Sequence, residues 1–280
     1  MKNARKFNWT DYFEEKDKVT QTNDVTALYN TTGSKSYYVY FCIFDECKSK
    51  SAIYIKRDNE ICTLLEDNKF TRCKSTSEGG SVYYDCHQSG QFVQQRNSYS
   101  ESIASDYMSF YQWVKYSPDY KNYAFQISVS KCGESESEGW YAFDIAWGDL
   151  RFENNNITYN KCTAGSSIHS ILDGKSSTCN FSTFKENNQG GSPSLEFWSN
   201  NDSYIQTVSY CNVIGNKCGT DNDQVLFRCN YNTNVDHCVF LNNTPVYMFD
   251  ISYKGYTLTI TDSCIESNSI STGGTVTFER

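Results

Sequence analysis

The 280-residue sequence lacks several features that would point directly to a class of function. It contains no run of about 18 or more apolar residues, so nothing in it predicts a membrane span. No cluster of lysine and arginine interleaves with aromatic residues, and the net charge is −8 with a pI near 5.0. This charge argues against a nucleic-acid partner. The segment from Met1 to Thr10 is positively charged but has no apolar core, so no secretory signal is visible.

Signatures of catalysis and of metal binding are missing as well. The histidines His87, His169 and His237 stand alone, without Cys-x2-Cys or His-x3-His spacing, so no zinc site or other cofactor is predicted. The four short sequence signatures of polygalacturonases do not occur. Asp144 and Asp250 fall at matched strand positions about four turns apart, too far to act as a catalytic pair. No catalytic residue is therefore assigned.

A helical pattern is missing after about residue 35, whereas a short phrase recurs at a constant spacing. The phrase has an apolar residue, two spacers and an asparagine or cysteine. Its clearest copies are Phe44-Asp-Glu-Cys47, Phe70-Thr-Arg-Cys73, Val129-Ser-Lys-Cys132, Ile157-Thr-Tyr-Asn160, Phe184-Lys-Glu-Asn187, Val213-Ile-Gly-Asn216, Phe240-Leu-Asn-Asn243 and Ile265-Glu-Ser-Asn268. A weaker copy, Tyr99-Ser-Glu-Ser102, stands between the second and third of these, so the nine copies define eight steps from Cys47 to Asn268. These steps average about 28 residues, a period typical of stacked-repeat proteins.

The repeat predicts an all-β fold, a single right-handed parallel β-helix of about nine turns over residues 36–280. Residues 1–35 are predicted to be an N-terminal leader or cap. In each phrase the apolar residue is expected to point inward, and the asparagine to adopt the left-handed backbone of a corner and to hydrogen-bond to the next turn. The 13 cysteines are expected to be mostly reduced, buried thiols.

One row of outward-facing residues is a candidate binding surface. If the phenylalanines in the strands after the corners point inward, the residues that follow them point outward in successive turns. These residues are Asp144, Trp198, Arg228, Asp250 and Glu279. Trp198, flanked by Arg228 and Asp250, would suit a sugar ring or a protein side chain. The alternative is that these are ordinary solvent-facing strand residues.

Four phrases carry a resemblance to a known family: Tyr38-Val-Tyr-Phe-Cys-Ile-Phe-Asp-Glu-Cys47, Phe70-Thr-Arg-Cys73, Gly79-Gly-Ser-Val-Tyr83 and Gly90-Gln-Phe-Val93. Together they resemble a large family of β-helix proteins of trichomonad protists. The resemblance implies a pectin-lyase-like helix, and for some members a place at the cell surface. It implies no catalytic residues.

Three functions remain open at this point. The leading hypothesis is a non-catalytic β-helix that presents an extended recognition surface for carbohydrate or another protein, as a cell-surface or adhesion-type protein. The first alternative is a polysaccharide-active lyase or hydrolase, and the second is an intracellular scaffold. Six Asn-x-Ser/Thr sequons are a weak sign of export, because a chain rich in these residues contains several by chance.

Overall fold

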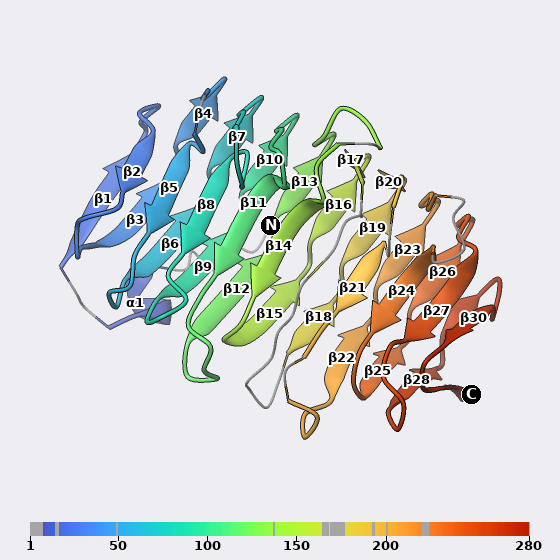
Figure 1. The fold of residues 1–280 in the computed structure, drawn as a ribbon. Helices are drawn as coiled ribbons and strands as arrows, with labels where there is room; N and C mark the ends of the chain where they lie inside the picture. Colours follow the sequence, from blue (N-terminus) through green and yellow to red (C-terminus); the bar gives the residue numbers. More distant parts are fainter. Residues whose placement is uncertain are drawn as a thin grey trace, which may run out of the picture.

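The chain folds into a parallel β-solenoid of about eight turns, where the repeat predicts about nine (Figure 1). The computed structural model describes residues 8–14, 17–48, 50–136, 138–163, 168, 177–191, 194–199, 201–219 and 224–279. Every strand pairing in this part of the chain is parallel, and partner strands come from neighbouring turns. The predicted solenoid is thus confirmed, while its right-handed sense stays a prediction.

Three faces run along the solenoid, and most of the described turns contribute strands to these faces in the same order. The eleven-stranded sheet contains β1 (Lys18–Thr22), β3 (Ser36–Tyr40), β6 (Cys62–Glu66), β9 (Gln91–Gln95), β12 (Lys121–Phe125), β15 (Asp149–Glu153), β18 (Thr178–Asn180), β22 (Gln206–Ser209), β25 (Thr233–Asp236), β28 (Thr257–Thr261) and β31 (Thr275–Glu279). The nine-stranded sheet contains β4 (Ile43–Asp45), β7 (Lys69–Thr71), β10 (Ser98–Ser100), β13 (Ser128–Ser130), β16 (Asn156–Thr158), β19 (Thr183–Lys185), β23 (Asn212–Ile214), β26 (Val239–Leu241) and β29 (Cys264–Ile265).

The remaining face, called the third face below, consists of two sheets. The first contains β2 (Leu28–Asn30), β5 (Ile53–Lys56), β8 (Val82–Asp85), β11 (Tyr107–Trp113) and β14 (Tyr141–Ala146). The second contains β21 (Leu195–Phe197), β24 (Val225–Cys229), β27 (Tyr247–Ile251) and β30 (Ile270–Thr272). A small pair, β17 (Lys161–Cys162) and β20 (Asn188–Gln189), lies between the nine-stranded sheet and this face.

Two sharp corners in each turn explain the spacing inside the repeated phrase. At the corner that leads into the nine-stranded sheet, a single left-handed residue such as Asp67 (φ 54°) is followed by an inward residue, Asn68. The corner that leaves this sheet has the same form, with Arg72 (φ 51°) and then Cys73. The left-handed residue is therefore the second spacer of the phrase. The expectation that the asparagine itself adopts this backbone was wrong, because the asparagine side chain has to point into the solenoid.

The inward asparagines form a hydrogen-bonded ladder, as predicted. The Nδ2 of Asn160 donates to Oδ1 of Asn187 at 2.9 Å, and the steps from Asn187 to Asn216 and from Asn216 to Asn243 measure 3.0 Å. Each of these amides also hydrogen-bonds to the backbone. For example, Nδ2 of Asn187 donates to the carbonyl of Ile157. Buried amides remain stable only when they are paired in this way.

The cysteines lie mainly inside the solenoid. Eleven of the 13 are buried, Cys47 is half-buried and Cys264 is exposed, and all are free thiols in this structure. The sulfurs of Cys179 and Cys211 are 4.0 Å apart. Stacked phenylalanines such as Phe44 and Phe70, with ring centroids 5.0 Å apart, fill the core beside them.

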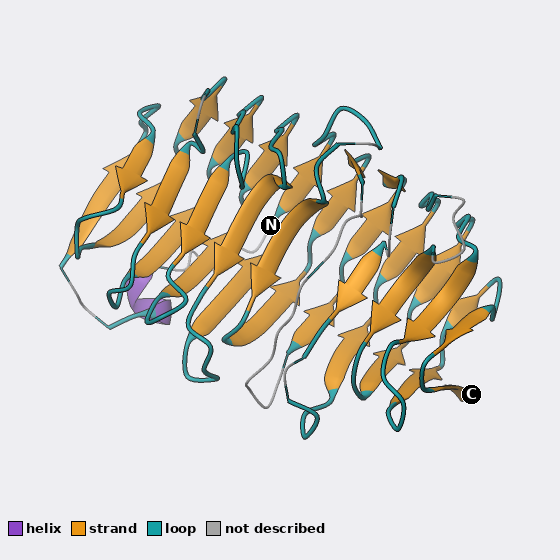
Figure 2. Ribbon diagram, viewed as in Figure 1, coloured by secondary structure: helices purple, strands orange, loops and turns teal. Residues whose placement is uncertain are grey.

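The segment predicted as a leader or cap contains two strands of the solenoid. β1 pairs with β3 and β2 pairs with β5, so both belong to sheets of the main body. The helix α1 (Trp9–Tyr12), purple in Figure 2, does not lie over an end of the solenoid. Its Trp9 and the following Phe13 pack with Leu64 and Val93 on the outer side of the eleven-stranded sheet. There they bury apolar side chains that would otherwise face water.

Candidate functional site

A row of stacked tyrosines runs along the outer side of the third face. The strand register aligns Tyr29, Tyr54, Tyr83 and Tyr111 in successive turns. Their ring centroids are 5.1, 4.7 and 5.0 Å apart and their planes differ by at most 17°. The strands alternate as their sequence predicts, because the residues beside these tyrosines belong to the core and the tyrosines do not.

Burial increases along this row. The side chain of Tyr29 is 54% exposed, whereas Tyr83 is 3% and Tyr111 is 6% exposed. Burial raises the pKa of both Tyr83 and Tyr111, and the carboxylates of Asp85 and Asp144 raise it further. Both hydroxyls therefore stay protonated at any physiological pH and remain hydrogen-bond donors.

Beyond the tyrosine row lies a group of rings called the tryptophan cluster, made of His87, Trp113, Tyr116 and Trp147. The ring of Trp147 is 4.7 Å from Trp113, 5.7 Å from Tyr116 and 5.9 Å from His87, measured between centroids. Trp147 is inclined by 45° to Trp113 and by 75° to the other two rings. Both tryptophans are half-buried and Tyr116 is 38% exposed. Rings inclined in this way do not cover one another completely, and Trp147 also packs partly against the hydrophobic core.

Two buried carboxylates hold the aromatic groups in place. Asp144 is 1% exposed and accepts a hydrogen bond from Nε1 of Trp113 at 2.9 Å. Asp85 is 8% exposed, lies 2.5 Å from Nδ1 of His87 and accepts from the hydroxyl of Tyr83 at 3.3 Å. The ammonium of Lys56, 3.8 Å from Asp85, supplies a compensating charge. Charge-assisted bonds of this kind fix the indole and imidazole orientations before any ligand arrives.

The predicted residues lie further along the same face, and two of the three come together. Arg228 and Asp250 are aligned in neighbouring strands, and Nε of Arg228 donates to Oδ2 of Asp250 at 2.8 Å. Trp198 is not in this row, because β21 pairs so that Glu196, and not Trp198, is opposite Arg228. Trp198 is half-buried and meets Tyr253 edge to face, with centroids 6.3 Å apart.

The two end members of the predicted row, Asp144 and Glu279, lie on different faces of the solenoid. Asp144 does lie on the outer side of the third face, opposite Tyr111, but it is buried there. Placing Glu279 in this row was wrong, because β31 pairs with β28 in the eleven-stranded sheet. The hydroxyl of Tyr141 donates a hydrogen bond to Oε2 of Glu196 at 3.4 Å. This bond links the two sheets of the third face, so the surface continues across the break between them.

Sequence reasoning missed the tyrosine row and the tryptophan cluster. A signal was present, since the four tyrosines recur at spacings close to the repeat period. Their role could not be assigned because the same pattern is expected of core residues. His169 lies outside the described residues.

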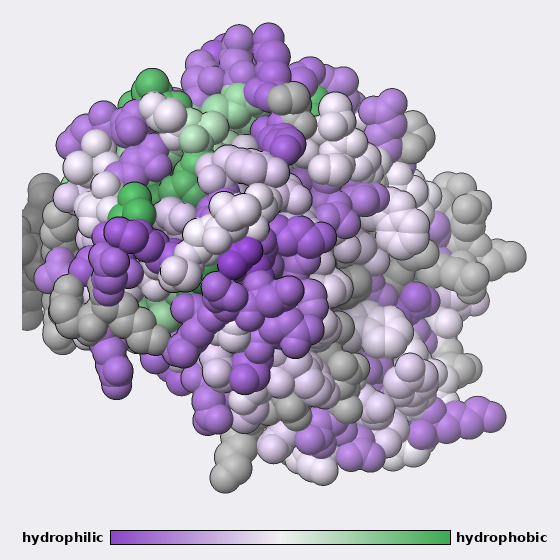
Figure 3. Space-filling view, turned by 60° about the vertical axis from the view of Figure 1, so that its left-hand side comes forward, coloured by the Kyte–Doolittle hydropathy of each residue, from purple (hydrophilic) through white to green (hydrophobic). Residues whose placement is uncertain are grey.

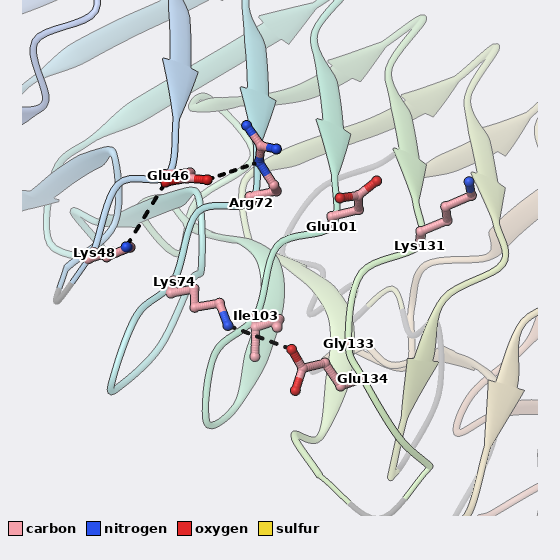
Figure 4. A pocket seen from close by; sticks show the side chains of 9 residues that line it. All are labelled: Glu46, Lys48, Arg72, Lys74, Glu101, Ile103, Lys131, Gly133 and Glu134. Atoms are coloured by element: carbon pink, nitrogen blue, oxygen red, sulfur yellow. Dashed lines mark ion pairs between the residues drawn. The ribbon is translucent and has the colours of Figure 1, made fainter.

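A charged groove of about 470 Å³ lies along the corner after the nine-stranded sheet (Figure 4). Its cations and carboxylates largely neutralise one another. Glu46 is 4.0 Å from Lys48 and 3.6 Å from Arg72, and Lys74 is 3.6 Å from Glu134. These internal ion pairs leave the groove little net charge with which to select a ligand, so the third face is the better candidate.

The surface offers no large apolar patch in the view that turns the β1 end of the solenoid forward (Figure 3). Hydrophobic side chains among the described residues form only small groups there, between hydrophilic ones.

Comparison with known proteins finds no matching family model, no similar curated protein and no similar solved structure. In the described part of the chain, no helix has the length and apolar character of a membrane span. The candidate site therefore has to be interpreted from its own chemistry.

Proposed function

We propose that this protein is a non-catalytic β-solenoid that binds an extended carbohydrate along the outer side of the third face. The observation that carries the proposal is the tryptophan cluster, in which inclined aromatic rings on a regular, open face are fixed by buried carboxylates. The pectin-lyase-like character implied by the sequence resemblance, and a place at the cell surface, form part of the same proposal.

The chemistry of the cluster suits sugar rings. The C–H groups on one side of a pyranose ring pack against an aromatic face, while its hydroxyls need donors and acceptors at the edge. Trp147 and Tyr116 supply the partly exposed rings, and Lys56 and His87 supply polar groups beside them. Because the third face is an open sheet surface, we expect a chain of several sugars and not a single buried one.

The charged continuation of the face adds a second contact area. The Nε of Arg228 is engaged by Asp250, and the other nitrogens of this guanidinium are the donors we assign to ligand hydroxyl or carboxylate groups. Trp198 follows β21, the strand before those of this pair, and would contact the same ligand chain. The predicted residues Trp198, Arg228 and Asp250 thus become the distal part of the proposed site.

Affinity electrophoresis in gels that contain different soluble polysaccharides tests this function. At least one polysaccharide should retard the protein, and Trp147→Ala should abolish most of the retardation. Phe181→Ala is the matched control, because Phe181 is 56% exposed but follows β18, at the corner away from the third face. Equal retardation of both variants, or no retardation by any polysaccharide, would overturn the proposal.

A second candidate, a polysaccharide-active enzyme, is favoured by one observation. Asp85 and His87 form a close carboxylate–imidazole pair directly beside Trp147, and such a pair can move a proton. Release of reducing ends or unsaturated products from the retarding polysaccharide, abolished by Asp85→Asn, would establish this enzyme in place of the binding protein.

A further inference from the structure

A second group of functional side chains lies at the corner between the eleven-stranded and nine-stranded sheets. Phe181, Tyr210, His237 and Asp262 occupy the left-handed position of this corner in successive turns, with φ between 45° and 55°. The ring of Phe181 stacks on Tyr210 at 5.1 Å, and Tyr210 stacks on the imidazole of His237 at 4.9 Å. The stack therefore fixes the plane of the imidazole and ends at Asp262.

Three potential ligand side chains converge at this end of the stack. One ligand atom each from Asp236, His237 and Asp262 lies within 4.8 Å of the other two. The closest approach described is 2.8 Å, between Oδ1 of Asp236 and Nδ1 of His237. The side chains of Asp236 and His237 are 36% and 47% exposed, and Asp262 is also exposed, so an ion can reach the group directly from solvent.

The charge of the group is not balanced by neighbouring cations. Among the described residues, neither aspartate makes an ion pair with a lysine or arginine. The strand register aligns Asp236 with Thr261 and Thr261 with Glu279. Glu279 therefore adds a third carboxylate to this side of the sheet, in the turn after that of Asp262. Carboxylates this close repel one another, and a divalent cation removes that repulsion.

We propose that Asp236, His237 and Asp262 form a binding site for a divalent metal ion such as Mn²⁺ or Zn²⁺. Two carboxylate oxygens and one imidazole nitrogen are a donor set that these ions accept, and exposed positions around the ion leave room for water. A soft ion such as Cu⁺ is disfavoured because the described group contains no sulfur. The site is on a different corner from the third face, so it does not depend on carbohydrate binding.

Titration of the full chain with Mn²⁺, followed by electron paramagnetic resonance of the free ion, tests the site directly. Mn²⁺ is the probe because thiols bind it weakly, which matters in a chain with 13 cysteines. We expect one Mn²⁺ per chain, displaced by Zn²⁺, and a dissociation constant raised by about tenfold or more in His237→Gln and in Asp262→Asn.

His87→Gln is the matched control, because His87 also pairs with an aspartate but is in no described group of three ligands. Its Mn²⁺ affinity should equal that of the wild-type protein. Equal affinity in His237→Gln and the wild type would overturn the proposal, as would the failure of the wild type to bind Mn²⁺. Thermal unfolding of each variant without metal shows that the substitution has not disturbed the fold, since all three side chains lie at the surface.

Discussion

The two halves of the solenoid build the same corner with different side chains. At the inward position after the nine-stranded sheet, the N-terminal half has Cys47, Cys73, Ser102 and Cys132, and the C-terminal half has Asn160, Asn187, Asn216 and Asn243. The thiols make only long, weak hydrogen bonds, such as 3.7 Å from Cys73 to the carbonyl of Phe44. The amides make short bonds to one another and to the backbone. One backbone geometry is thus stabilised mainly by packing in one half and by hydrogen bonds in the other.

The third face shows a parallel contrast. Its N-terminal sheet carries aromatic rings held by buried carboxylates, and its C-terminal sheet carries the ion pair of Arg228 and Asp250. The difference indicates that the repeat constrains which positions point outward, while the chemistry at those positions is free to vary from turn to turn.

Alkaline pH should have the largest effect, and the buried thiols at the N-terminal corner positions contribute to it together with buried thiols elsewhere in the core. Burial raises the pKa of both Cys73 and Cys132 from 9.0 to about 12. These folded-state pKa values lie above the pKa of a cysteine thiol in the unfolded chain. The stability that the two protonated, buried thiols contribute is therefore complete below pH 9 and is lost as the pH rises toward 12. Each thiol should then cost roughly 1.4 kcal/mol of stability per pH unit in that range.

Urea unfolding at several pH values from 8 to 11 measures this loss. The variant Cys73→Ala/Cys132→Ala should show a shallower decline than the wild type, since it lacks two of the titrating groups. An identical decline would mean that the thiol column does not set the alkaline limit.

The next largest effect is expected for Asn187→Ala in the amide half. This change removes hydrogen bonds to the carbonyl of Ile157 and to Asn216, and leaves Asn160 without its acceptor. We expect the free energy of unfolding to fall by about 3 kcal/mol, because buried polar groups are left unpaired. Equilibrium urea denaturation measures the loss.

The corresponding change in the thiol half, Cys73→Ala, serves as the control. It removes one buried sulfur and should cost about 1 kcal/mol through the small cavity it leaves. Equal losses in the two variants would remove the distinction between packing and hydrogen bonding on which the comparison of the two halves depends.

On the third face, Trp147→Ala should weaken carbohydrate binding more than any change in the C-terminal sheet. A ring at the centre of a binding surface commonly contributes about 2 kcal/mol, which corresponds to roughly a thirtyfold change in the dissociation constant. Quantitative affinity electrophoresis, with migration measured at several polysaccharide concentrations, gives this ratio. Far-UV circular dichroism of the variant checks that the solenoid is retained.

Arg228→Ala should have the smallest effect, a few-fold loss of binding or about 0.5 kcal/mol, because its guanidinium is already partly engaged by Asp250. Arg151→Ala is the control, since Arg151 is an exposed arginine of β15 on the eleven-stranded sheet. A larger loss in Arg228→Ala than in Trp147→Ala would move the centre of the site to the charged sheet.

Much of this architecture can be predicted from the sequence because each turn repeats the same local geometry. The phrase ending at Cys73 or Asn187 predicts an inward apolar residue, a corner and a buried small or amide side chain, and the structure has all three. The period, the parallel pairing and the burial of most cysteines are consequences of that repetition. Only the identity of the left-handed residue was predicted one position too late.

The candidate sites depend on distances between turns, which no local pattern contains. Trp198 was placed beside Arg228 because aligning the phenylalanines put Phe197 opposite Phe227, whereas β21 enters its sheet with Leu195 in that position. Loops between the nine-stranded sheet and the third face vary in length, so the register there is set by packing of whole turns. The same packing buries Asp144 beside Trp113 and brings His237 to Asp262; the repeat places each pair in neighbouring turns but does not predict the contact of their side chains. The sequence therefore specifies the repeating frame, and the stacking of the turns specifies which outward side chains meet.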